Sequence, residues 1–169
     1  MSDSRPEVVR TEEEWKKLLS PEQYAVSRQR GTERAHGPSY EEFQKQGEGT
    51  YFCVSCGAPL FGSSEKFNSG CGWPSFYDAL KTGNVLEKRD VSLGMARTEV
   101  VCRRCDGHLG HVFDREGFKT PTDRRFCINA ASLRFVPKGN PPPPLLDARS
   151  PEVEKKKAEV AKEDPGKGD

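Results

Sequence analysis

Four of the six cysteines form two Cys-x-x-Cys pairs, Cys53 with Cys56 and Cys102 with Cys105. The two-residue spacing lets both thiolates of a pair bind one ion at about 2.3 Å, and two pairs complete a tetrahedron. Two independent redox pairs, or four small buried side chains, are the alternatives. We predict one zinc ion, although iron also fits four thiolates. Since four thiolates leave no position for a catalytic water, the ion is expected to be structural and to contribute much of the folding energy.

Cys127 lies outside both pairs, in a run that alternates like a half-buried strand. If Phe126 and Ile128 face the core, Cys127 and Asn129 share the opposite face, about 7 Å apart along the strand. Core packing alone does not account well for a thiol beside an amide on an open face. The two arginines before Cys127 would also help to lower the pKa of the thiol. We therefore favour a redox role for Cys127 over the simpler interpretation of a small buried apolar residue.

Cys71 lies in the run Ser69–Pro74, whose glycines predict a loop with a movable backbone. A thiol on such a loop can reach a sulfenic acid elsewhere and close a disulfide. A small buried cysteine is again the simpler alternative. Trp73 belongs either to the core or to the apolar wall of a pocket, and its place between Gly72 and Pro74 favours the pocket.

Two histidines, His108 and His111, follow directly after the second cysteine pair. Because four thiolates already fill the metal site, we expect neither imidazole to be a ligand. The metal would anchor this segment and hold the imidazoles rigidly as acid–base groups near neutral pH. The alternative is that one of them is a hydrogen-bonding strut beside the metal.

The elements that must position these residues fall into three zones of different composition. Residues 1–49 predict a helical arm that packs on the core, because Thr11 opens a capping box and Ser20 precedes a proline at a first helical position. Residues 50–137 hold all six cysteines and predict a small antiparallel β domain. Its expected strands are Thr50–Val54, Val85–Ser92, Thr98–Arg103, His111–Asp114 and Arg125–Asn129.

Residues 138–169 predict a solvated tail, since four prolines are followed by mixed charges and few apolar side chains. The whole chain carries 27 Lys and Arg against 26 Asp and Glu, and its longest basic block is three lysines, which argues against nucleic acid as a partner. No apolar run approaches the roughly 18 residues of a membrane span. We expect a cytoplasmic protein, since we see no targeting signal, and a monomer, since no long apolar face demands a partner.

Four runs carry a resemblance to a known family: Gly72–Phe76, Arg97–Val100, His108–Phe113 and Arg125–Asn129. Together with both cysteine pairs they resemble the methionine-R-sulfoxide reductases of the B type, the SelR domain, over about Gly31 to Pro137. The resemblance implies a mainly β fold with two antiparallel sheets around a structural zinc ion (Mss4-like, or β-tent) and short N-terminal helices. It also implies reduction of the R epimer of methionine sulfoxide, in proteins or free, and hence repair of oxidised proteins.

The same resemblance implies a role for each candidate site residue. Cys127 matches the catalytic nucleophile and Cys71 the resolving cysteine, and thioredoxin or a similar dithiol would reduce the disulfide between them. Positions associated with the sulfoxide oxygen and with hydrogen bonding in the site are His111, His108 and Asn129. The expected substrate contacts are Trp73, which matches the aromatic residue for the S-methyl group, Phe126 and Arg125.

Two other function classes account for part of the pattern. A zinc-ribbon binding module explains the four paired cysteines but gives no role to Cys71, Trp73 and Cys127. A thiol peroxidase or disulfide exchanger would use the same two unpaired cysteines, and peroxide turnover without sulfoxide turnover would distinguish it.

Overall fold

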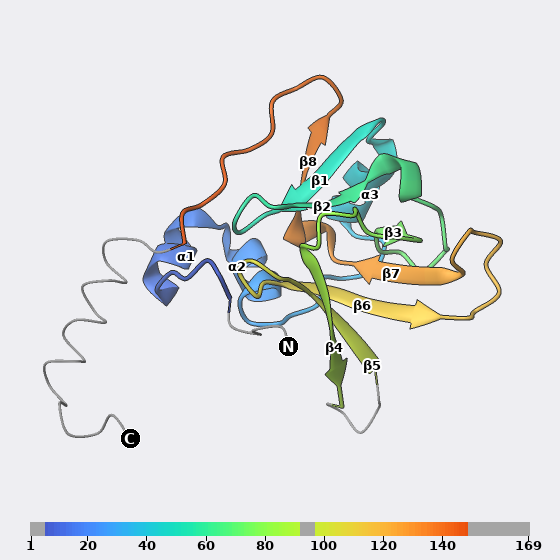
Figure 1. Ribbon diagram of the computed structural model, residues 1–169, viewed down its shortest axis with the longest axis horizontal. Helices are drawn as coiled ribbons and strands as arrows, with labels where there is room; N and C mark the ends of the chain where they lie inside the picture. The colour runs from blue at the N-terminus through green and yellow to red at the C-terminus, as the bar shows by residue number, and fades with distance from the viewer. Residues whose placement is uncertain (1–5, 92–96, 149–169) are drawn as a thin grey trace, which may run out of the picture.

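The computed structural model describes residues 6–91 and 97–148 of the 169-residue chain. Three short helices come first, and β-strands in two sheets follow (Figure 1). The helices are α1 (Glu12–Leu18), α2 (Pro21–Ser27) and α3 (Pro38–Lys45). Thr11 and Ser20 begin the first two with complete capping boxes, as the sequence predicts. The third was not predicted, although Gly37 and Pro38 supply an ordinary helix start.

Both sheets are antiparallel, so the predicted mainly β fold with two antiparallel sheets is confirmed. The smaller sheet has the order β2 (Pro59–Gly62), β1 (Gly49–Cys53) and β8 (Leu133–Pro137). The larger sheet has the order β3 (Ser75–Phe76), β7 (Arg124–Ile128), β6 (His108–Asp114), β5 (Arg97–Cys102) and β4 (Val85–Asp90). The five predicted strands correspond to β1, β4, β5, β6 and β7. The prediction missed β2, β3 and β8, which are short or lack a clear alternation of apolar and polar residues.

An aromatic cluster joins the two sheets to α3. Phe61 of the smaller sheet stacks on Phe76 of the larger one, with ring centroids 4.5 Å apart. Tyr51 meets Phe76 at 5.2 Å, and Phe43 of α3 meets it at 5.7 Å. Such pairs add favourable geometry to a large apolar area removed from water. The helical arm is therefore part of the same core as the sheets.

The described part of the C-terminal zone follows the surface of the core. Residues 141–148 run back from β8 to the region of α1 (Figure 1). There the Leu146 N–H donates to the Cys56 carbonyl at 3.0 Å, and the Val9 N–H donates to the Ala148 carbonyl at 2.8 Å. Backbone hydrogen bonds and the Leu146 side chain attach this stretch to the core, although most of its side chains are exposed. The rest of the predicted tail, 149–169, lies outside the described residues. Within residues 6–91 and 97–148, no helix is long and apolar enough to cross a membrane.

Candidate functional site

The two cysteine pairs lie on matching turns at the ends of β1 and β5. In the first turn the Cys53 N–H donates to the Ala58 carbonyl at 2.8 Å, and the Gly57 N–H donates back to the Cys53 carbonyl at 2.9 Å. In the second, the Cys102 N–H donates to the Gly107 carbonyl at 2.9 Å, and the Asp106 N–H donates back at 2.8 Å. Both turns close through a residue with positive φ, Gly57 at 84° and Asp106 at 62°. The same local hydrogen bonds thus present each pair of sulfurs in the same way.

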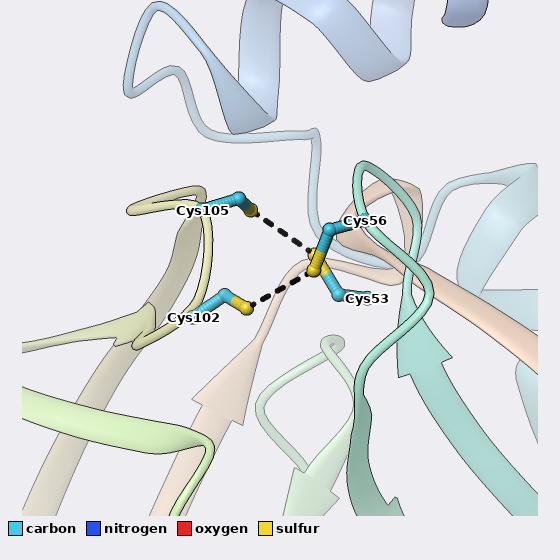
Figure 2. Close-up of side chains that lie close together, drawn as sticks. All are labelled: Cys53, Cys56, Cys102 and Cys105. Atoms are coloured by element: carbon cyan, nitrogen blue, oxygen red, sulfur yellow. Dashed lines mark hydrogen bonds between the residues drawn. The ribbon is translucent and has the colours of Figure 1, made fainter. Parts of the chain in front are cut away.

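The four sulfurs of these turns form one buried cluster (Figure 2). The Cys53 and Cys105 Sγ atoms are 3.6 Å apart, as are those of Cys56 and Cys102, and all four lie within 4.8 Å of one another. A tetrahedral ion with bonds of about 2.3 Å separates its sulfur ligands by about 3.8 Å. The described residues therefore bring together four ligands with the spacing that a tetrahedral metal ion requires.

The helical arm covers one side of the sulfur cluster. The Arg28 guanidinium donates to Cys105 Sγ at 3.3 Å and to the Cys105 carbonyl at 3.0 Å. It also lies over the Trp15 ring, 4.3 Å from the centroid, which fixes its plane. A positive group beside four thiolates offsets part of their mutual repulsion.

The two unpaired cysteines meet on the larger sheet, apart from the sulfur cluster. Their Sγ atoms are 3.6 Å apart, and both side chains are partly exposed. Cys127 is directly opposite Ser75 of β3 on one side and His111 of β6 on the other. Residues directly opposite each other in adjacent strands share a face, with Cβ atoms about 5 Å apart. The sheet register therefore places one thiol between a hydroxyl and an imidazole.

The contact between the two sulfurs shifts the pKa values of the two thiols in opposite directions. The hydrogen bond from the Cys127 thiol lowers the pKa of Cys71 to about 4, helped by the hydroxyls of Ser69 at 3.1 Å and Ser75 at 3.5 Å. The same contact and burial raise the pKa of Cys127, while Arg125 acts in the opposite direction. The pair thus carries one negative charge near neutral pH, with the remaining proton between the sulfurs.

Arg125 does not point freely toward a ligand. Its guanidinium forms an ion pair with Glu116, with contacts of 2.8 and 3.1 Å, and lies 4.4 Å from the centroid of Phe113. From this position its charge acts on Cys127. Phe126 is 2 % exposed and packs edge-on against Phe61 in the core. The expectation that Phe126 contacts substrate is therefore corrected: the alternation of β7 turns it inward, opposite to Cys127.

The two histidines share a face because β6 contains a bulge. Gly110 is opposite Val100 and His108 is opposite Val101, so Leu109 is an extra residue in β6. Without it, residues three apart would face opposite sides of the sheet. The two imidazole centroids are instead 5.6 Å apart.

Each imidazole is held by a carboxylate. His108 Nδ1 lies 2.7 Å from Glu99 Oε2, and Glu99 also pairs with Arg30 from the arm. His111 Nε2 lies 2.9 Å from Asp90 Oδ2. These contacts fix ring orientation and leave the second nitrogen of each ring for other partners. The sequence reasoning missed Glu99, although an acidic residue inside an apolar strand is the signal that could have identified it.

Asn129 differs from its predicted position. It follows the last residue of β7, is 4 % exposed, and donates through Nδ2 to the Leu109 carbonyl at 3.0 Å. Its Oδ1 accepts from the Glu33 N–H at 2.9 Å. The idea that Cys127 and Asn129 share an open face is wrong, because β7 ends at Ile128 and the arm covers the amide. Trp73 is partly exposed, and its indole N–H donates to the Glu33 carbonyl at 2.9 Å.

Comparison with known proteins supplies an independent view of the chain. Residues 19–137 match a protein family described as the SelR domain. The peptide methionine sulfoxide reductase MsrB of Pseudomonas savastanoi is 54 % identical over 129 residues, which cover 76 % of this chain and 95 % of that protein. The protein of the same name from Thiobacillus denitrificans is 52 % identical over 138 residues, 82 % of this chain and 99 % of its own. The one from Leptospira interrogans is 52 % identical over 129 residues, 76 % and 95 % respectively.

Proposed function

Because the chain belongs to the SelR domain family, the family of the peptide methionine sulfoxide reductases, we propose that it reduces the R epimer of methionine sulfoxide in oxidised proteins. The observation that carries this proposal is the 3.6 Å contact between Cys71 Sγ and Cys127 Sγ beside His111. Two thiols at this distance, outside the metal cluster, can alternate between dithiol and disulfide. Methionine sulfoxide reduction needs that two-electron capacity.

In the first step the Cys127 thiolate attacks the sulfoxide sulfur. For this Cys127 must first transfer its proton to Cys71, whose Sγ lies 3.6 Å from Cys127 Sγ. A proton from an imidazole, His111 or His108, goes to the sulfoxide oxygen, which would otherwise leave as a strong base; such acid catalysis contributes about 10²- to 10⁴-fold. The protonated oxygen then passes from the methionine sulfur to Cys127 Sγ: the sulfur–oxygen bond to methionine and the new sulfur–sulfur bond both break, and a bond between the oxygen and Cys127 Sγ forms. Methionine leaves as the thioether with the electron pair on its sulfur, and Cys127 is left as a sulfenic acid.

In the second step Cys71 attacks the Cys127 sulfenic sulfur, and water leaves as the disulfide forms. A disulfide needs a sulfur–sulfur distance of about 2.05 Å, so the two sulfurs must approach by about 1.5 Å. Gly70 and Gly72, with φ of 80° and 88°, flank Cys71 and give its loop backbone freedom. A thioredoxin-like dithiol then reduces this disulfide by thiol–disulfide exchange, which restores both thiols and leaves the dithiol oxidised. The net change is sulfoxide plus dithiol to thioether, disulfide and water.

We propose the substrate contacts and the metal from the family to which the chain belongs and from the positions of these residues in the structure. Trp73 would receive the S-methyl group on its partly exposed ring, so that only one epimer directs its oxygen toward the imidazoles. Zinc would bind the four clustered cysteines and hold β1 against β5, with no open position for chemistry.

The test is incubation of separate R- and S-sulfoxide peptides with the protein and dithiothreitol, followed by chiral chromatography. Loss of the R epimer alone, absent in Cys127→Ser, is expected. Cys71→Ser should complete one turnover but fail with thioredoxin as reductant. Loss of neither epimer by metal-loaded, folded protein would contradict the proposal and favour a zinc-ribbon binding module, and peroxide turnover alone would favour a thiol peroxidase.

A further inference from the structure

One segment of the helical arm contacts the site from outside the β domain. Residues 30–36, here called the strap, connect α2 to α3. The His36 N–H donates to the Gly72 carbonyl at 2.9 Å, next to Cys71, and the His36 ring occupies the space where a Cβ on Gly72 would lie. Arg30 at the other end pairs with Glu99, the carboxylate that holds His108. The strap thus touches the loop of one redox cysteine and the support of one histidine.

The middle of the strap is Glu33, whose backbone holds two further site residues. Its N–H donates to Asn129 Oδ1 at 2.9 Å, and its carbonyl accepts from Trp73 Nε1 at 2.9 Å. Trp73 and Asn129 lie in different loops. The backbone N–H and carbonyl of Glu33 therefore set the distance between these two side chains. A shift of the Glu33 backbone would move both side chains.

The Glu33 side chain fixes that backbone in place. Its Oε2 accepts from the Ala130 N–H at 2.8 Å, and its Oε1 accepts from the Ala131 N–H at 2.8 Å. Both donors lie in the 3₁₀ turn that follows β7 and Cys127. Burial raises the pKa of Glu33 while these two bonds lower it. A half-buried carboxylate with both oxygens on backbone donors is a two-point anchor that an amide cannot reproduce.

We propose that Glu33 is a positioning residue of the site: its carboxylate anchors the strap to the turn after Cys127 and thereby holds Trp73 and Asn129 in register with the cysteine. The proposal rests on the proposed sulfoxide reduction for its kinetic consequence. It predicts that loss of the anchor impairs sulfoxide reduction more than the intrinsic reactivity of the thiol. Glu33 itself touches no reacting atom.

Glu33→Gln is the sharpest test, because glutamine offers one acceptor oxygen where the two N–H groups need two. Glu22→Gln is the matched control: Glu22 is an exposed arm residue close enough to act on the charge of Glu33, and the substitution removes the same charge without removing an anchor. Three quantities are compared in the full chain: kcat/KM with an R-sulfoxide peptide, the alkylation rate of Cys127, and the indole N–H signals in a ¹H–¹⁵N spectrum. The chain has two tryptophans, so Trp15 serves as the internal reference and Trp73→Phe assigns the signals.

We expect Glu33→Gln to lower kcat/KM by about 10- to 100-fold, the effect of a misplacement near 1 Å, while Cys127 alkylation changes less than about twofold. The Trp73 indole signal should shift and exchange faster with solvent, while the Trp15 signal and all readouts of Glu22→Gln stay as in the unmodified chain.

An unmoved Trp73 signal, or a kcat/KM equal to that of Glu22→Gln, would overturn the proposal. So would an equal loss of alkylation and reduction, which indicates general loosening. If Glu33→Gln does not fold, Glu33→Asp keeps both oxygens on a shorter side chain and is judged by the same comparison. Absence of sulfoxide reduction in the unmodified chain would contradict the proposed function instead, and the Trp73 signal would then decide the anchor by itself.

Discussion

Replacing Cys71 with serine should make Cys127 more reactive toward an alkylating agent, even though it removes one member of the proposed redox pair. The raised pKa of Cys127 comes first from its contact with Cys71 and then from burial. Serine is neutral at this position and can donate a hydrogen bond to a Cys127 thiolate. Both effects favour the thiolate, which is the nucleophilic form.

The magnitude follows from the 3.6 Å separation. Two unit charges at this distance interact by about 4.6 kcal/mol at an effective dielectric constant of 20, and partial exposure of both side chains reduces this to about 2 kcal/mol. That free energy corresponds to about a 30-fold larger thiolate population at neutral pH. Because a less basic thiolate is a weaker nucleophile, with a Brønsted coefficient near 0.45, the net gain in rate is about 5- to 10-fold.

Iodoacetamide labelling followed by tryptic mapping measures this rate. Cleavage after Arg125 and Arg134 leaves Cys127 as the single cysteine of its peptide. Ser64→Ala, an exposed change in the neighbouring turn, is the control and should leave the rate unaltered. An equal or slower rate in Cys71→Ser would refute the reasoning that the two sulfurs share one proton.

The remaining predictions concern acidity, backbone packing and the metal. Since the pKa of Cys71 is lowered to about 4, thiolate absorbance at 240 nm should persist to about pH 5 and vanish as the pH falls through about 4; a midpoint near 8 would contradict the contact. Gly110→Ala places a Cβ inside van der Waals contact of the Cys127 carbonyl oxygen, so urea unfolding should show a loss of about 1 to 3 kcal/mol in the free energy of unfolding, and a neutral result would exclude this close approach of β6 and β7. Cys53→Ser should release the metal and much of the strand signal in circular dichroism, whereas a folded, metal-free variant would argue against a structural ion.

Short-range patterns in the sequence predicted much of this protein. The Cys-x-x-Cys spacing predicts two metal-binding turns because the hydrogen bonds that shape each turn lie within six residues, from Cys53 to Ala58 in the first. The capping box at Thr11 is equally local, since donor and acceptor are three residues apart. The alternation around Cys127 correctly places Phe126 and Ile128 in the core, because side chains in a strand alternate between faces, but it fails for Asn129, which lies beyond the strand and is buried.

The tertiary structure alone decided which distant groups meet. Cys71 and Cys127 are 56 residues apart, and only the pairing of β3 with β7 brings their sulfurs into contact. His108 and His111 share a face because of a bulge, which depends on how β6 pairs with β5 and leaves no clear mark in the residues themselves.

The arm shows the same limit most clearly. Glu33 is an ordinary polar residue in the sequence, yet docking of the strap makes it the partner of Trp73, Asn129 and the turn after Cys127. Local sequence determines hydrogen bonds within a turn or a helix end, because their partners are always near in the chain. Contacts between segments depend on how whole elements pack, and therefore only the folded structure reveals them.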